Sequence, residues 1–274
     1  MFQGKTAFIT GAGSGIGRAL AVTLAQRGCA LSLTDINEEG LKETADQVQR
    51  HNVGLRTGIL DVSDRSAVEQ AVNDTVEEFD ALDLIFNNAG VALTDPVDQV
   101  TYDDFEWLMN INFWGVVYGT KAALPHMQKQ NSGHIINISS LFGLIGVPTQ
   151  SAYCAAKFAV RGFTESLVAE LKFTDANITA HSVHPGGVAT SIAKSGRFRN
   201  DIAGAGTKEQ SLKNAERMLT LPAENAAEII LEGIRTNNPR IIVGADARRL
   251  DFIQRLMPRK VTDMLVKMSK KNRE

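Results

Sequence analysis

Short apolar runs alternate with longer amphipathic segments along most of the chain. Seven runs of six or seven residues, rich in β-branched and apolar side chains, are typical of buried strands; they are residues 5–10, 30–35, 54–60, 82–87, 133–139, 178–183 and 239–244. Six longer stretches have helical composition or spacing; they are residues 15–27, 37–51, 63–79, 101–129, 150–173 and 223–236. This alternation predicts an α/β fold, with a doubly wound parallel sheet of about seven strands and helices on both faces in a single domain.

One segment interrupts the alternation after the sixth predicted strand. Residues 191–220 hold Gly196, Gly204 and Gly206 among many polar residues. Ligands bind beyond the carboxyl ends of strands in such sheets, so we interpret this segment as a lid over the substrate. A variable surface loop is the alternative.

The C-terminal residues differ from the rest in charge. Residues 248–274 contain nine basic and three acidic residues, a balance of +6, whereas the other 247 residues contain 20 basic and 28 acidic, a balance of −8. We therefore expect a domain at 1–247 and a basic amphipathic extension at 248–274. The apolar stripe of the extension, interrupted near Pro258, comprises Leu250, Ile253, Met257, Val261, Met264, Leu265 and Met268. This stripe packs on the body or on a neighbouring subunit; alternatively, it contacts an anionic membrane surface or covers the substrate entrance.

The remaining bulk properties narrow the class of protein. No run of 18 apolar residues and no signal peptide are recognised, so we expect a cytoplasmic protein. Cys29 and Cys154 lack the spacing of a disulfide framework or a zinc site, and the five histidines lack ligand spacing. No metal and no nucleic-acid partner are expected.

The first predicted strand leads through a glycine-rich turn into a helix. Glycines let the backbone approach a pyrophosphate closely, and the helix N-terminus offers unpaired N–H groups and a positive dipole end. The segment therefore predicts a dinucleotide site, with a flexible glycine loop as the alternative. Its candidate cofactor-binding residues are Gly11, Ser14, Gly15, Ile16 and Gly17.

Asp35 ends the second predicted strand, 18 residues after Gly17. An acid at this position can accept hydrogen bonds from an adenosine ribose and repels a 2′-phosphate, which favours NAD over NADP. Arg18 is the residue that could favour NADP instead. Asp35 could alternatively cap the helix at 37–51.

Tyr153 and Lys157 lie four residues apart in an alanine-rich helical run, so their side chains share one face. A phenol has a pKa near ~10, and a cation about 4 Å away could lower it by two to three units. This pair could therefore perform acid–base chemistry near neutral pH. The alternative is an ordinary surface lysine beside a core tyrosine.

With these motifs in order, the chain resembles the short-chain dehydrogenase/reductase family over nearly all of residues 4–246. Thr10-Gly11-x-x-x-Gly15-x-Gly17 is similar to the family's cofactor motif, and Asn87-Asn88-Ala89-Gly90 to its motif at the fourth strand. The resemblance implies a Rossmann-like fold. The residues at the positions of the family's catalytic tetrad are Asn112, Ser140, Tyr153 and Lys157.

The resemblance also implies roles for further residues. Lys157 would hold the nicotinamide ribose, and Asn112 would bind a water that relays protons; otherwise Asn112 bends its helix and satisfies buried backbone. Ser140 would hydrogen-bond the substrate oxygen, with Ser139 as the alternative. Further cofactor contacts are expected at Asp61 and Val62 beside the adenine, at Asn88, Ala89 and Gly90 along the cofactor, and at Pro185, Gly186, Val188 and Thr190 near the nicotinamide.

The expected activity is NAD(P)-dependent interconversion of a secondary alcohol and a ketone. An apolar substrate, aliphatic, alicyclic or steroid- or lipid-like, is suggested by Ile192 and Phe198 in the lid and by Leu141, Phe142, Leu144, Ile145, Val147 and Pro148 before Tyr153. Arg197 and Arg199 could instead grip a carboxylate. His184 could reach the site rim, although a structural role is the expectation.

Three other functions are weighed against this one: a non-catalytic NAD sensor or scaffold, a membrane-peripheral lipid dehydrogenase, and a sugar-nucleotide epimerase or dehydratase. The last resembles a longer chain with a separate substrate domain, and only about 90 residues follow Pro185 here. The helices at 101–129 and 150–173 carry apolar residues on several faces, and the family usually pairs them in dimers and tetramers. A homodimer or homotetramer is therefore expected.

Overall fold

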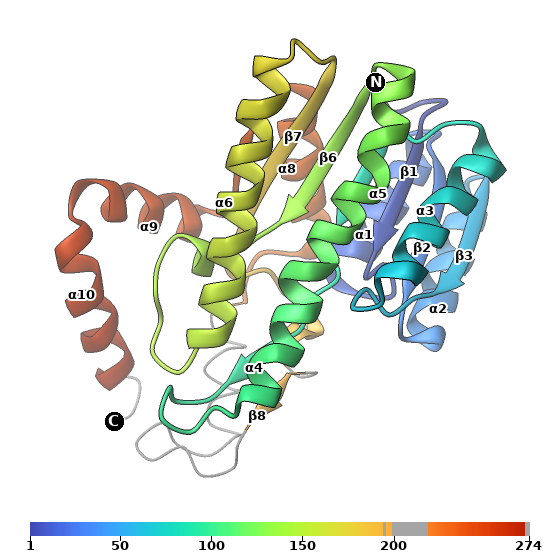
Figure 1. The fold of residues 1–274 in the computed structure, drawn as a ribbon. Helices are drawn as coiled ribbons and strands as arrows, with labels where there is room; N and C mark the ends of the chain where they lie inside the picture. Colours follow the sequence, from blue (N-terminus) through green and yellow to red (C-terminus); the bar gives the residue numbers. More distant parts are fainter. Residues whose placement is uncertain (194–195, 199–218, 272–274) are drawn as a thin grey trace.

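The computed structural model describes residues 1–193, 196–198 and 219–271, which are built around one seven-stranded parallel sheet (Figure 1). The strands run in the order β3-β2-β1-β4-β6-β7-β9, with every neighbouring pair parallel. Their bounds are β1 Thr6–Thr10, β2 Ala30–Asp35, β3 Leu55–Ile59, β4 Leu84–Asn87, β6 Gly133–Ile138, β7 Ile178–Pro185 and β9 Arg240–Val243. All seven predicted strands are confirmed.

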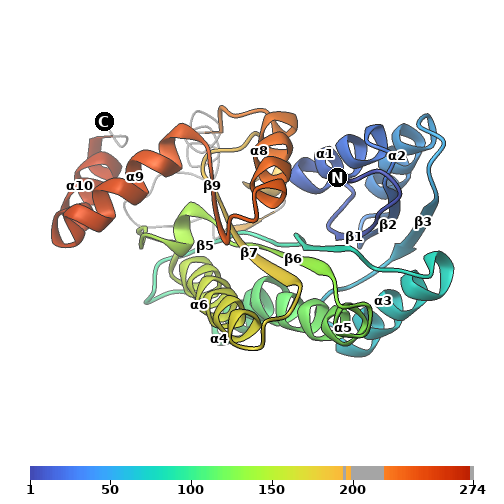
Figure 2. The same ribbon diagram turned by 90° about the horizontal axis from the view of Figure 1, so that it is seen from above.

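Helices cover both faces of the sheet, as predicted (Figure 2). On one face lie α1 (Gly15–Gln26), α2 (Glu38–Gln49) and α8 (Ala223–Arg235), and on the other α3 (Arg65–Phe79), α5 (Gly115–Gln130) and α6 (Ser151–Phe173). Successive strand residues point to opposite faces, so Phe8 and Ile9 join two separate hydrophobic clusters. The two clusters fix the register of the sheet, because a slip of one residue would exchange them.

The strand order reverses between β1 and β4. The chain moves outward from β1 through β2 to β3 and then returns to the other side of β1. A crevice forms at such a reversal, outside the carboxyl ends of the strands. Gly11 and Asn88, which follow β1 and β4, therefore face the same crevice.

The predicted helix at 101–129 is divided into three parts. It comprises α4 (Tyr102–Met109), a π-helical segment (Asn110–Trp114) and α5. A small parallel pair, β5 (Leu93–Thr94) with β8 (Arg197–Phe198), was not predicted, since two residues are too few for a periodic signal.

Two C-terminal helices, α9 (Ala245–Leu256) and α10 (Pro258–Lys271), form a hairpin beyond β9 (Figures 1 and 2). Pro258 starts the second helix, where its missing N–H costs nothing. Val261 is buried, and Leu250, Ile253 and Leu265 pack around the same cluster against the segment after β6. Leu250, Ile253, Val261 and Leu265 of the predicted stripe thus pack on the body, whereas Met257 is exposed. The side chain of Met268 lies outside the described residues. Within the described ranges, no helix has the length and apolar character needed to span a bilayer.

Candidate active site

A cavity of about 480 Å³ lies at the carboxyl ends of the strands. Most of the predicted site residues line it: Gly11, Ser14, Gly15, Ile16, Asp35, Asp61, Val62, Asn88, Ala89, Gly90, Ser140, Tyr153, Lys157, Pro185, Gly186, Val188 and Thr190. Gly17 and Asn112 do not belong to the lining. The fold therefore brings residues from seven segments of the sequence to one cavity.

The glycine turn leaves the start of α1 open toward this cavity. Ser14 is the N-cap of α1 but makes no side-chain hydrogen bond to it, whereas Asn37 and Asp64 cap α2 and α3 with their side chains. The first N–H groups of an uncapped helix suit an anion. Gly15 has φ +53, and a Cβ there would lie 2.9 Å from Thr190 Cγ2, so both the backbone and the space require glycine.

Gly17 acts in packing rather than in lining the cavity. A Cβ on this residue would lie 2.1 Å from the Gly11 carbonyl oxygen and 2.6 Å from Asn88 Nδ2. Asn88 Nδ2 in turn donates to the carbonyls of Thr10 and Gly11 at 2.9 and 3.1 Å. The third glycine of the motif therefore lets α1 approach β1 and the turn after β4.

Asp35 is held by two backbone N–H groups. Its Oδ2 accepts from Gly13 N at 2.7 Å, and its Oδ1 accepts from Asn37 N at 2.8 Å. Asn37, and not Asp35, is the N-cap of α2, so the alternative of a helix-capping Asp35 is wrong. These bonds fix the carboxylate at one end of the cavity and leave lone pairs for hydroxyl donors.

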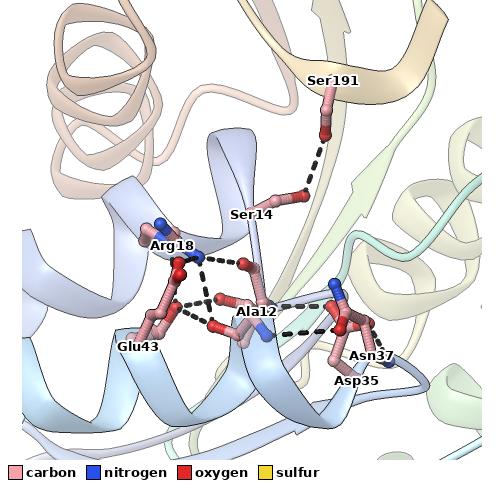
Figure 3. A network of polar contacts seen from close by, with 10 residues as sticks. Ala12, Ser14, Arg18, Asp35, Asn37, Glu43 and Ser191 are labelled. Atoms are coloured by element: carbon pink, nitrogen blue, oxygen red, sulfur yellow. Dashed lines mark hydrogen bonds and ion pairs between the residues drawn. The ribbon is translucent and has the colours of Figure 1, made fainter. Parts of the chain in front are cut away.

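The Arg18 guanidinium is hydrogen-bonded to other protein groups and not to Asp35 (Figure 3). Its guanidinium donates to the Gly13 and Gly40 carbonyls, to Thr44 Oγ1 and to Glu43 Oε2. Figure 3 shows Arg18 turned toward Glu43, with Asp35 and Asn37 on the other side of Ala12. The arginine that could have favoured a 2′-phosphate is thus committed to protein acceptors.

Tyr153 and Lys157 lie one helical turn apart on α6, and Lys157 Nζ is 5.6 Å from the centre of the Tyr153 ring. Nζ donates to the Ile138 carbonyl at 3.0 Å, and the lysine is only 3% exposed. Burial raises the pKa of Tyr153 to about 12, against an opposing effect of a hydrogen bond with Ser140. Burial lowers the pKa of Lys157 to about 8. The expected lowering of the phenol's pKa is therefore wrong for the protein alone, because desolvation by burial outweighs the hydrogen bond with Ser140.

The two adjacent serines after β6 have different partners. Ser139 is buried, and its Oγ donates to the Lys157 carbonyl at 2.8 Å. Ser140 Oγ accepts from Phe142 N at 3.1 Å and is the hydrogen-bond partner of Tyr153. Ser140 is therefore the serine next to the phenol, and Ser139 fixes the helix that carries it.

His184 hydrogen-bonds to the backbone of Ser140. Its Nδ1 lies 3.1 Å from the Ser140 carbonyl oxygen, which can only accept, so Nδ1 carries the proton. Its Nε2 then accepts from Ser182 Oγ at 3.0 Å. Burial lowers the pKa of His184 to about 4, which keeps the ring neutral. The expected structural role fits this geometry.

Asn112 is fully buried within the π-helical segment. Its Oδ1 accepts from Val91 N at 2.8 Å, and its Nδ2 donates to the Val91 carbonyl at 2.9 Å. A Cβ on Gly90 would lie 3.2 Å from Asn112 Oδ1 and 3.6 Å from Lys157 Nζ, so Gly90 lies close to both side chains. The side-chain amide thus satisfies the backbone of Val91, as the alternative interpretation expects, and the role in binding a water stays a prediction.

The expected substrate wall lies elsewhere. Leu141, Leu144 and Ile145 are buried against the α9–α10 hairpin and do not line the cavity. Ile192, which was expected to contribute apolar surface, does line the cavity, together with Val91 and Leu219, which were not predicted. Most of the predicted lid at 191–220 lies outside the described residues, as do Arg199, Gly204, Gly206 and the side chain of Phe198.

Two interactions near the cavity were missed at the level of sequence. Asp246 Oδ2, in the first turn of α9, accepts from Gly187 N at 2.7 Å. Arg197 forms an ion pair with Asp104, and its guanidinium lies 3.7 Å from the centre of the Trp107 ring. Arg197 is therefore engaged with protein groups rather than poised for a substrate carboxylate. Asp246 could have been suspected, because an acid in the first turn of a helix complements the dipole.

Comparison with known proteins agrees with this geometry. The family described as short chain dehydrogenase matches residues 5–200. The chain is 43% identical over 258 residues to a Mycobacterium tuberculosis protein named as the oxidoreductase SadH, covering 93% of this chain and 92% of that one. It is 31% identical over 262 residues to estradiol 17-beta-dehydrogenase 11 of Rattus norvegicus, covering 96% and 83%.

Among solved structures, a short-chain dehydrogenase/reductase from Burkholderia phymatum in complex with NAD superposes with a TM-score of 0.84 at 30% identity, covering 93% of this chain and 95% of that chain. The chain belongs to the short-chain dehydrogenase/reductase family of oxidoreductases.

Proposed function

We propose that this protein is an NAD-preferring dehydrogenase that interconverts a secondary alcohol and a ketone. The observation that carries the proposal is the shared cavity: the open start of α1, the Asp35 carboxylate, and the Tyr153 and Lys157 side chains all line it. A dinucleotide would extend from Asp35 and Asp61 past the glycine turn to Lys157. Gly13 and Gly15 let Asp35 and Thr190 approach the glycine turn closely, which supports this fit.

Bound nicotinamide would supply the hydride acceptor or donor. Tyr153 exchanges the hydroxyl proton of the substrate, and Ser140 donates a hydrogen bond to the substrate oxygen. The pKa of Tyr153, about 12 in the protein alone, keeps the phenol protonated at neutral pH, the form that reduction of a ketone needs. Lys157, held by the Ile138 carbonyl, stabilises the phenolate when the proton leaves.

Asp35 supports the preference for NAD. Its carboxylate faces the cavity with two N–H groups behind it, and Arg18 is bonded to four protein acceptors. A 2′-phosphate would therefore meet a fixed negative charge, while the Arg18 guanidinium is held by protein acceptors. The apolar lining at Val91, Ile192 and Leu219 supports an apolar substrate such as an aliphatic, alicyclic or steroid-like alcohol.

The oligomeric state is part of the proposal. Trp114 and Phe158 are 43% and 41% exposed on the neighbouring helical segments, and Trp114 stacks on Tyr118 at 5.9 Å. These exposed aromatic side chains support pairing of the α5 and α6 surfaces in a homodimer or homotetramer. The cytoplasmic location stays a prediction.

The test is titration with NADH and NADPH, followed by turnover of a panel of apolar secondary alcohols and ketones, with wild type and Tyr153→Phe. We expect tighter NADH binding, and loss of turnover in Tyr153→Phe by a factor of about 10² or more with cofactor binding retained. Tighter NADPH binding would contradict the argument from Asp35. Binding of NADH without turnover on any substrate would favour a sensing role.

A further inference from the structure

The α9–α10 hairpin has one face packed on the body and one face turned outward. Its inner face reaches the segment that precedes Tyr153, where Leu141 and Ile145 pack against Ala247 and Val261. Asp246 ties the start of α9 to Gly187. The hairpin is therefore a fixed part of the fold, and in Figures 1 and 2 it projects beyond the sheet with no other described element on its outer side.

The outer face exposes large apolar side chains. Phe252 and Leu256, one turn apart on α9, are 63% and 64% exposed, and Met257 at the corner of the hairpin is 43% exposed. Single exposed apolar residues are ordinary, but three within six positions at the tip of a projecting element form a patch.

Basic side chains surround this patch. Arg248 and Arg249 precede it on α9, and Arg255, Arg259 and Lys260 flank Met257; all five are exposed. Of the nearby acids, Asp251 is bonded to Arg240 and Arg255, and Asp246 accepts from Gly187 N. Asp263 on α10 is a further exposed acid, and Arg255 is paired with Asp251. Arg248, Arg249, Arg259 and Lys260 still leave the outer face positive on a protein whose residues 1–247 carry a balance of −8.

We propose that this face docks on an anionic lipid bilayer surface, with Phe252, Leu256 and Met257 inserted at the interface and the arginines beside lipid phosphates. Apolar side chains ringed by Arg and Lys match a bilayer with anionic headgroups in both polarity and charge. A second copy is a poorer match, because a two-fold interface would bring the same arginines together. A nucleic acid would leave the apolar patch without a partner.

The docked hairpin would also border the segment that leads to Tyr153. Val147 and Pro148, shortly before Tyr153, line a groove together with Thr262 and Val266 of α10. The docking itself does not depend on the proposed reaction.

The experiment is flotation of the full-length protein with vesicles of phosphatidylcholine alone or mixed with phosphatidylglycerol, at low and high salt. We expect flotation with the anionic vesicles, lost at high salt. Arg248→Glu with Arg249→Glu should lower partitioning by about 25-fold or more, since each basic residue near such a surface contributes about fivefold. Phe252→Ser with Leu256→Ser should lower it on the order of tenfold for each withdrawn side chain.

Two matched controls separate this surface from general effects. Phe173→Ser removes another exposed aromatic side chain, and Lys42→Glu with Arg50→Glu reverses two exposed charges on the α2 side of the molecule. Both controls should float like wild type, and all variants should keep the wild-type melting temperature. Equal flotation with neutral vesicles, equal losses in the controls, or absence of flotation would overturn the proposal. A change of oligomeric state in the hairpin variants alone would instead assign the face to a second copy.

Discussion

The buried charge of Lys157 is expected to lower the free energy of unfolding at neutral pH, although the same lysine is a proposed catalytic residue. The lysine is 3% exposed, its hydrogen bond goes to the Ile138 carbonyl, and burial lowers its pKa from 10.5 to about 8. At about 1.36 kcal/mol per pKa unit, this shift corresponds to roughly 3 kcal/mol of lost stability at neutral pH. We therefore predict that Lys157→Met abolishes turnover but raises the free energy of unfolding.

The pH dependence gives the sharper test. Between pH 8 and 10.5 the unfolded chain holds the lysine proton that the folded protein has lost, so wild-type stability rises with pH relative to the variant. The advantage of Lys157→Met should shrink by about 2 kcal/mol between pH 7 and pH 9.5. The loss of a partner for the Ile138 carbonyl costs about 1–3 kcal/mol, but this cost does not depend on pH.

The assay is urea unfolding of wild type and Lys157→Met at both pH values, without added cofactor. Lys42→Met, at an exposed position on α2, is the control and should show no such change. Tyr153 and the cysteines titrate in both proteins, so their effects cancel in the difference. A stability difference that stays constant from pH 7 to pH 9.5 would refute the reasoning.

Three further predictions follow from the site. Gly17→Ala should lower the free energy of unfolding in urea by about 3 kcal/mol and weaken NADH binding, because the added Cβ would lie 2.1 Å from the Gly11 carbonyl oxygen. Gly146→Ala is the neutral control, since an added Cβ there would have nothing within 4 Å. In fluorescence titration, Asp35→Asn should raise the Kd for NADH about tenfold and bring it closer to the Kd for NADPH. Asp46→Asn is the control and should leave both Kd values unchanged. Burial lowers the pKa of His184 from 6.5 to about 4, so the unfolded chain binds more protons between these values and the free energy of unfolding falls as the pH is lowered; His184→Gln should remove about 2 kcal/mol of the loss measured between pH 7 and pH 5.

The sheet could be predicted because its strands are buried on both faces. Such strands are continuous apolar runs, and β1 and β4 lie between two helical layers. The cofactor side of the cavity could be predicted equally well, since Gly11 directly follows one predicted strand and Asp35 ends another. Parallel strands bring such positions to one edge, so strand ends alone were enough to group them.

The substrate side was predicted less well because side-chain direction there depends on tertiary contacts. Leu144 and Ile145 are apolar and lie between Ser140 and Tyr153, yet they face the hairpin and not the cavity. No periodicity is available in a segment without regular secondary structure to distinguish the two faces. The pKa of Tyr153 was misjudged for a related reason, since its desolvation depends on the packing of distant segments.

The π-helical segment between α4 and α5 has a consequence for how this region can change. A π-helical turn accommodates one more residue than an α-helical turn within a single wider turn, so the helix on either side of it keeps its phase. Deleting one residue from 110–114 would therefore leave a continuous α-helix in which Trp107 still lies under Arg197. The deletion would instead change which side chain occupies the place of Asn112 beside Val91. The π turn thus lets the helix present Asn112 toward the turn after β4 without redirecting the side chains of α4.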